Sequence, residues 1–281
     1  MADGAYRWQG NAPAPDAARV DEIDAAFDDA QAGAFAEPVR AAAVEKIERA
    51  LATARTGDLT EAAAQLTHVR ALLADLSPAS LEPRRGLGGL FDSRNGRLKR
   101  FRDAYARAAA SLADVAADLT GRVEGAARRS ETLDSLWGDI RDAVVDLDTH
   151  LAAAARRLTG SSPLEEDAAF ALDGRKATLD ACRGAAIGAL PLIRGAQNAD
   201  ARAAETLKAC ADGVALWRDD WKDALGLSGK RPKKVRPDHA RLLKFRDDLV
   251  KRVDRALVEV TASRARRADV EGRLAELRRP L

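Results

Sequence analysis

The fold is decided by residues 97–159, which read RLKRFRDAYARAAASLADVAADLTGRVEGAARRSETLDSLWGDIRDAVVDLDTHLAAAARRLT. This stretch contains no proline and has an apolar residue at every seventh position. The repeated positions are Leu98, Tyr105, Leu112, Leu119, Ala126, Leu133, Ile140, Leu147 and Ala154. Sustained heptads are typical of long helices that pack against other helices. If unbroken, this helix would extend roughly 95 Å at about 1.5 Å per residue.

Glycines are the weak points of this stretch. Gly121, Gly125 and Gly138 each lower helix stability by about 1 kcal/mol relative to alanine. A second apolar row also slips near Arg122, where Val123 takes over the apolar position. We therefore expect a bend or break around residues 121–130.

Helical spacing of apolar residues continues on both sides of the heptads. On the N-terminal side it predicts helices over about 16–33, 37–56 and 58–76, with Asp16 and Asp58 as caps. On the C-terminal side it predicts helices over about 164–197, 199–226 and 238–279, the last capped by Asp238. No run of alternating β-branched residues is present. The predicted fold is all-α, an elongated antiparallel helical bundle with long coiled-coil-like helices.

Breaks in the helical pattern divide the chain into four predicted parts. Residues 1–15 form an arm, and residues 16–77 form a small N-terminal helical region that caps the bundle. Residues 78–96 are a basic, glycine-rich linker. Residues 97–281 form the long-helix bundle, in which 97–159 and 238–279 pack along each other.

Composition points to a soluble protein without a general affinity for polyanions. The formal net charge is only +2, so any anion-binding role must be local, and no nucleic-acid partner is expected. The N-terminus lacks the basic and apolar regions of a signal peptide. The longest apolar runs, such as 185–193, are far shorter than the ~20 residues that span a bilayer. We expect a cytoplasmic location.

The first basic segment is residues 84–102, in which arginines and lysines alternate with leucine and phenylalanine. The candidate anion or membrane contacts are Arg84, Arg85, Leu90, Phe91, Arg97, Lys99 and Arg100. Such a segment could lie in a membrane interface or hold a phosphate-bearing ligand. Alternatively, its apolar residues could pack under the long helix while its arginines pair with acidic helix faces.

The second basic segment, residues 230–236, has five positive charges in seven residues. It could bind an anion or an acidic partner, or it could be an exposed connector between antiparallel helices. The candidate partner surface comprises Lys230, Arg231, Lys233, Lys234, Arg236, Trp217 and Trp221. The two tryptophans lie one turn apart, so they could instead pack against another helix.

No arrangement typical of catalysis is present in the sequence. It contains no phosphate-binding glycine loop, no nucleophile elbow and no Cys-x-x-Cys pair. Cys182 and Cys210 fit buried apolar positions, and Asp146 with His150 provides too few ligands for a closed metal site. We therefore predict a protein that is not an enzyme, with no cofactor and no metal. An enzyme or metal protein that uses these cysteines or the Asp146–His150 pair is the competing hypothesis.

Three segments resemble a known family. They are RRGLGGLF at residues 84–91, RLKRFRDAY at 97–105 and ETLDSLW at 131–137, with a fainter echo in ALPLIR at 189–194. Over residues 83–155 the chain resembles the toxic-anion-resistance (TelA-like, tellurite-resistance) family. The resemblance implies a cytoplasmic, all-helical bacterial protein linked to tellurite resistance or envelope stress. It supplies no catalytic residues to assign.

These observations favour a non-enzymatic helical scaffold or adaptor. Its partners would be other proteins of a resistance or stress system. The alternative is a peripheral protein that binds an anionic membrane surface through residues 84–102. A homo-oligomer also stays open, because a heptad seam serves intermolecular as well as intramolecular pairing.

Overall fold

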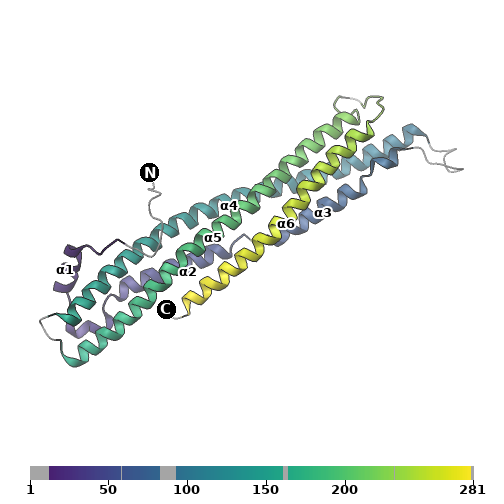
Figure 1. Ribbon diagram of the computed structural model, residues 1–281. Coiled ribbons are helices and arrows are strands. Elements are labelled where there is room, and N and C mark those ends of the chain that lie inside the picture. The colour runs from purple at the N-terminus through teal and green to yellow at the C-terminus, as the bar shows by residue number, and fades with distance from the viewer. Residues whose placement is uncertain (1–12, 58, 83–92, 161–163, 231, 280–281) are drawn as a thin grey trace. The chain divides into compact units, whose positions relative to one another are not determined.

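The computed structural model describes residues 13–57, 59–82, 93–160, 164–230 and 232–279 (Figure 1). Within these ranges the regular elements are all helices and no strand occurs. This confirms the predicted all-α fold. The elements are α1 (Ala17–Ala25), η1 (Asp29–Ala34), α2 (Glu37–Arg55), α3 (Thr60–Asp75), η2 (Pro78–Leu81), α4 (Arg94–Thr159), α5 (Glu166–Ala224) and α6 (His239–Arg278), where η marks a short 3₁₀ helix.

The heptad positions of α4 form the apolar core. All nine residues of the repeat are at most 8% exposed, and most are fully buried. The apolar seam of α6 is buried in the same way, as at Leu242, Val253, Ala256 and Leu274. Burial of these rows stabilises the helices by about 25 cal/mol per Å² of apolar surface removed from water.

Two predicted interruptions are absent. The break expected at 121–130 is wrong, because α4 is helical over all 66 residues from Arg94 to Thr159. Likewise, α5 runs unbroken through Pro191, joining the helices predicted over 164–197 and 199–226. Gly and Pro lower only local helix propensity, whereas neighbours such as Leu119, Leu190 and Leu192 are buried and hold the helix in place.

The helix starts largely follow the predicted caps. The Asp16 carboxylate accepts the backbone N–H of Ala18 at 3.0 Å, and the Asp238 carboxylate accepts that of Arg241 at 3.1 Å. The predicted cap Asp58 lies outside the described residues. The first N-terminal helix ends at Ala25, earlier than expected, and η1 follows it.

The chain divides into two compact units. Unit 1 comprises Met1–Thr56, Arg129–Gln197 and Arg266–Leu281, and unit 2 comprises Gly57–Arg128 and Asn198–Ala265. This division differs from the predicted domains, because the N-terminal region contributes α2 to unit 1 and α3 to unit 2. Neither helix forms a separate cap: each packs with parts of α4, α5 and α6 in its own unit.

Unit 1 is a four-helix arrangement of α2 with the C-terminal part of α4, the N-terminal part of α5 and the C-terminal part of α6. Ion pairs of Arg183 with Asp148 and of Arg194 with Asp134 show that α4 and α5 run antiparallel here. The core gathers side chains from all four helices, including Ile47, Ile140, Ile193 and Leu274.

Unit 2 repeats this arrangement with α3 in the place of α2. Its core contains an aromatic cluster of Phe101, Tyr105, Trp217 and Trp221. The Tyr105 hydroxyl donates to the backbone oxygen of Arg218 at 2.6 Å, and Trp221 Nε1 donates to that of Leu242 at 3.1 Å. These bonds join α4 to α5 and α5 to α6 at one end of unit 2.

Candidate functional site: a basic cavity in unit 2

A cavity of about 790 Å³ lies beside the aromatic cluster, between the start of α4 and the loop that joins α5 to α6. It brings together parts of the two basic segments, which are far apart in the sequence. Its lining comprises Arg94, Asn95, Leu98, Lys99, Arg102, Asp103, Ala106, Leu227, Pro232, Lys233, Lys234, Val235 and Arg236.

The loop side of the cavity depends on how α5 ends. Gly226 adopts a left-handed conformation with φ of +68°. The Leu227 N–H then bonds to the Lys222 oxygen and the Gly226 N–H to the Asp223 oxygen, both at 2.8 Å. This is the Schellman arrangement that satisfies the last carbonyls of a helix. The chain turns back, and the Lys233 N–H reaches the Gly226 oxygen at 2.9 Å.

Arg102 fastens the loop to α4. Its guanidinium donates to the backbone oxygen of Leu225 through Nε at 2.8 Å and through Nη2 at 2.5 Å. Nη2 also donates to the Lys233 oxygen at 2.7 Å. A planar guanidinium can hold several oxygens at once, which a lysine ammonium cannot do with the same geometry. Arg94 adds a longer contact to the Val235 oxygen at 3.4 Å.

The lining is strongly basic. Six of its side chains carry positive charge, and Asp103 is the single acidic one. Elsewhere many arginines pair with carboxylates, as Arg122 does with Glu61 and Asp118. In the described part of the chain, no carboxylate pairs with the charged ends of Lys99, Lys233, Lys234 or Arg236. Like charges held together without counter-charges create a local site for an anion.

The start of α4 adds to the positive potential. The first turn of α4 has no acidic residue, whereas that of α5 has Glu166 and Asp167. The positive end of the helix dipole is therefore not neutralised by α4's own side chains.

The structure places the sequence-predicted site residues in different environments. Lys99, Lys233, Lys234 and Arg236 line the cavity. Arg97 is buried, and its Nε donates to the Leu81 oxygen at 3.3 Å, so it fastens η2 rather than lining the cavity. Two further predicted contacts, Arg100 and Lys230, are exposed and lie outside the lining. The structure does not describe Arg84, Arg85, Leu90, Phe91 and Arg231.

The two tryptophans do not belong to an exposed surface. Trp217 is 1% exposed and Trp221 is fully buried, because both rings pack in the aromatic core of unit 2. This agrees with the alternative in which they pack against another helix.

The sequence placed Arg102 and Leu98 in the first basic segment, but it did not predict that Arg102 fastens the loop or that Leu98, Leu227 and Val235 form one apolar surface of the cavity. The signal for the turn is present in Leu225-Gly226-Leu227, where a glycine follows an apolar helix end. The contact of Arg102 with residues over a hundred positions away leaves no local signal.

The other candidate chemical groups do not line the cavity. Cys182 belongs to unit 1 and Cys210 to unit 2, and both are buried. Burial raises the pKa of both thiols, that of Cys210 to about 11, which disfavours the reactive thiolate. His150 Nδ1 lies 2.8 Å from the backbone oxygen of Asp146. Among the described residues, no group of three or more potential ligands could hold a metal ion.

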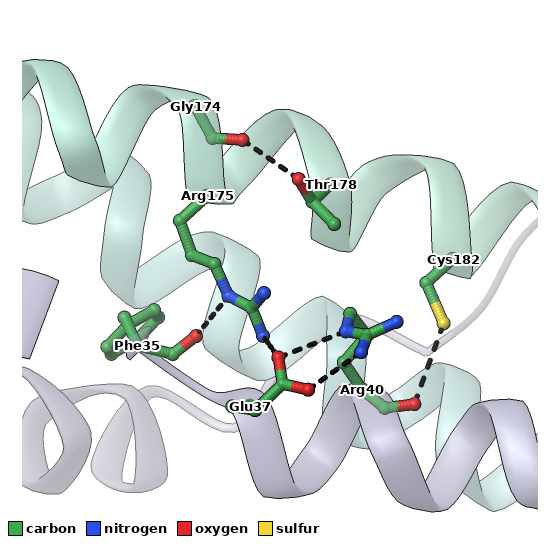
Figure 2. A network of polar contacts seen from close by, with 7 residues as sticks. All are labelled: Phe35, Glu37, Arg40, Gly174, Arg175, Thr178 and Cys182. Carbon is green, nitrogen blue, oxygen red and sulfur yellow. Dashed lines mark hydrogen bonds and ion pairs between the residues drawn. The ribbon is translucent and has the colours of Figure 1, made fainter. Parts of the chain in front are cut away.

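Unit 1 contains a polar network around Glu37 (Figure 2). Arg40 binds both carboxylate oxygens of Glu37, at 3.0 and 2.7 Å, and Arg175 also bonds to this carboxylate. Arg175 Nε donates to the Phe35 oxygen at 2.7 Å. The network holds the turn before α2, where Ala36 has a φ of 54° that is costly for a residue with a side chain. It stabilises this turn, and both of its arginines share the single carboxylate of Glu37.

Comparison of the chain with family models, curated proteins and solved structures finds no match. In the ranges that the structure describes, none of the helices has an apolar stretch long enough to cross a membrane.

Proposed function

We propose that the protein is a non-enzymatic helical adaptor that binds an anionic ligand in the basic cavity of unit 2. The observation that carries this proposal is the convergence of Arg94, Lys99, Lys233, Lys234 and Arg236 on one cavity with a single acid. Cations that are gathered on one cavity raise the local positive potential and so attract an anion.

The backbone supports this role. Arg102 holds the loop by three hydrogen bonds, and Gly226 sets its direction. Lys233, Lys234 and Arg236 are therefore carried by a loop that is fixed at both ends. The apolar core beneath, with Trp221 and Phe101, keeps α4 and α5 in register.

The experiment measures anion binding by calorimetry with pyrophosphate, sulfate, citrate and a short glutamate peptide. The double variant K233E/K234E reverses two charges of the cavity, and K208E/K251E reverses two exposed lysines of unit 2 outside it. We expect the wild type and K208E/K251E to bind at least one anion, with an affinity at least about tenfold higher than that of K233E/K234E. Absence of binding by the wild type, or equal binding by both double variants, would contradict the proposal.

A cytoplasmic role in tellurite resistance is the cellular part of the proposal, and it draws support from the resemblance of residues 83–155 to TelA-like proteins. A strain that lacks the gene should lose tellurite tolerance and regain it with the wild-type gene but not with K233E/K234E. Normal tolerance in the deletion strain would reject the resistance role and leave anion binding to be judged by calorimetry.

The anionic membrane surface is the second candidate, because Lys99 belongs to the predicted membrane-contact segment and lines the cavity. Sedimentation with anionic vesicles tests it. The charge reversals K99E and R100E, at two exposed residues, should release the protein if this segment is the contact, and unchanged sedimentation would exclude the segment.

A further inference from the structure

The basic cavity presents two chemically different surfaces. Lys99, Lys233, Lys234 and Arg236 supply charge, whereas Leu98, Leu227 and Val235 supply apolar surface. Leu98 is 8% exposed, and the other two are half-buried. A ligand that covers both surfaces carries negative charge at one end and a less polar body at the other.

The number of cations indicates a doubly charged group. A carboxylate carries one negative charge, whereas a phosphate monoester carries about 1.5 to 2 at pH 7 and has three acceptor oxygens. Arg94 makes one long contact with the Val235 oxygen, at 3.4 Å, which leaves most of its guanidinium donors for a ligand. Arginine and lysine together suit a phosphate. The guanidinium group can donate two parallel hydrogen bonds to two phosphate oxygens, and the ammonium group attracts the phosphate as a point charge.

The size of the cavity indicates more than an inorganic ion. Its volume of about 790 Å³ lies within the range of about 300 to 1,000 Å³ that organic ligands occupy in proteins. An inorganic phosphate has five heavy atoms and would leave most of that volume to water. Binding of inorganic phosphate would then leave the apolar surface of Leu227 and Val235 in contact with water, so this surface would not contribute to the affinity.

We propose that the cavity binds a phosphate monoester of a small organic molecule, with the phosphate on the cationic side chains and the organic body over Leu98, Leu227 and Val235. This inference rests on the proposed function, because it names the ligand class of the same site. The phosphate comes either from a soluble ester or from the headgroup of a lipid such as phosphatidic acid.

The test compares four probes on the full chain by calorimetry and vesicle sedimentation. The probes are inorganic phosphate, adenosine monophosphate, a glutamate peptide and phosphatidylcholine vesicles with or without phosphatidic acid. We expect adenosine monophosphate or the phosphatidic acid vesicles to bind at least about tenfold more tightly than inorganic phosphate. Preference for the nucleotide identifies a soluble source, and preference for the vesicles identifies a lipid source.

Two single variants probe the apolar half of the cavity. L227S and V235S should reduce the advantage of the ester over inorganic phosphate by about fivefold, because only the ester has an organic body that covers these residues. Melting temperatures establish that both variants are folded, and the use of two positions guards against local disruption at either one.

The outcomes separate this inference from the proposed function. Equal affinity for inorganic phosphate and the esters, or preference for the glutamate peptide, would overturn the phosphate-ester inference while anion binding stands. Absence of binding to every anion would overturn both proposals.

Discussion

At the scale of single residues, Arg267 is a buried arginine that completes a helix end. It is 6% exposed and bonds to the backbone oxygens of Ala54 and Thr56, both at the C-terminus of α2. The last carbonyls of a helix have no partner within the helix, so a side chain that reaches them replaces water. Arg267 therefore links α6 to α2 within unit 1.

Removal of this side chain should destabilise the protein. We expect R267A to lower the free energy of unfolding by about 3 kcal/mol, because buried carbonyls lose charged donors and the site loses packing. R264A, at an exposed arginine three residues earlier, should change it by less than about 0.5 kcal/mol. Urea unfolding measures both, and equal effects would show that Arg267 is not a cap.

Glu37 makes one contribution to stability dependent on pH. Hydrogen bonding from Arg40, assisted by Arg175, lowers the pKa of this carboxyl from 4.5 to about 2, although burial acts in the opposite direction. A lowered pKa means that the ionised form is favoured in the folded protein. Its stabilisation is therefore fully present above about pH 4.5 and is lost as the pH falls through about 2.

The variant E37Q tests this contribution. The wild type should be more stable than E37Q above pH 4.5, and this difference in stability should shrink below pH 4.5 and be lost as the pH falls through about 2. E45Q changes an exposed carboxyl on the same helix and serves as the control. Chemical unfolding across this pH range measures the differences. A difference in the free energy of unfolding between the wild type and E37Q that stays constant with pH would contradict the lowered pKa of Glu37.

At the scale of elements, the end of α5 determines the position of the cavity loop. A Cβ on Gly226 would lie 2.8 Å from Val235 Cγ1 and 3.1 Å from the Lys233 oxygen, and its φ is positive. G226A should therefore cost at least about 1 kcal/mol of stability and also weaken anion binding, because the loop must move. Unfolding and calorimetry measure the two effects.

Gly121 provides the matched control in the same unit. A Cβ there would meet nothing within 4 Å, and the residue lies inside α4. G121A should stabilise the protein by about 1 kcal/mol and leave anion binding unchanged. If both substitutions changed stability in the same direction, backbone conformation would not explain the effect of G226A.

These two glycines also show what the sequence could predict. The heptads located α4 and its buried face, because periodic burial is a local property that neighbouring residues repeat. The predicted break at residues 121–130 and the predicted gap between residues 197 and 199 are absent, because packing against other helices outweighs local propensity. The division of the N-terminal helices between two units also depends on tertiary packing.

The site was predictable only in part, for the same reason. Lys99, Lys233, Lys234 and Arg236 were candidates because charge runs are visible in the sequence. Their convergence was not visible, since it depends on the antiparallel pairing of α4 with α5 and on Arg102 reaching Leu225. The same pairing buries Trp217 and Trp221, which the sequence left open as a partner surface.

At the scale of the whole molecule, the charge is almost balanced. The chain carries a net charge of only +2, yet the cavity lining has six basic side chains and one acidic one. Outside the lining, acidic residues slightly outnumber basic ones. Long-range attraction of an anion by the molecule as a whole is therefore weak, and the field close to the cavity must supply the attraction.

This contrast predicts a salt dependence that follows the cavity and not the net charge. Between about 50 and 200 mM salt, the wild type should lose about threefold to tenfold in affinity for a phosphate ester, because ions screen the lining. K208E/K251E lowers the net charge as much as K233E/K234E does, but it should keep the wild-type salt dependence because both lysines lie outside the lining. K233E/K234E should show weak binding with a shallow salt dependence. If K208E/K251E and K233E/K234E both lost the salt dependence of affinity to the same extent, the total charge of the protein would attract the anion. The cavity would then have no special role in recognition.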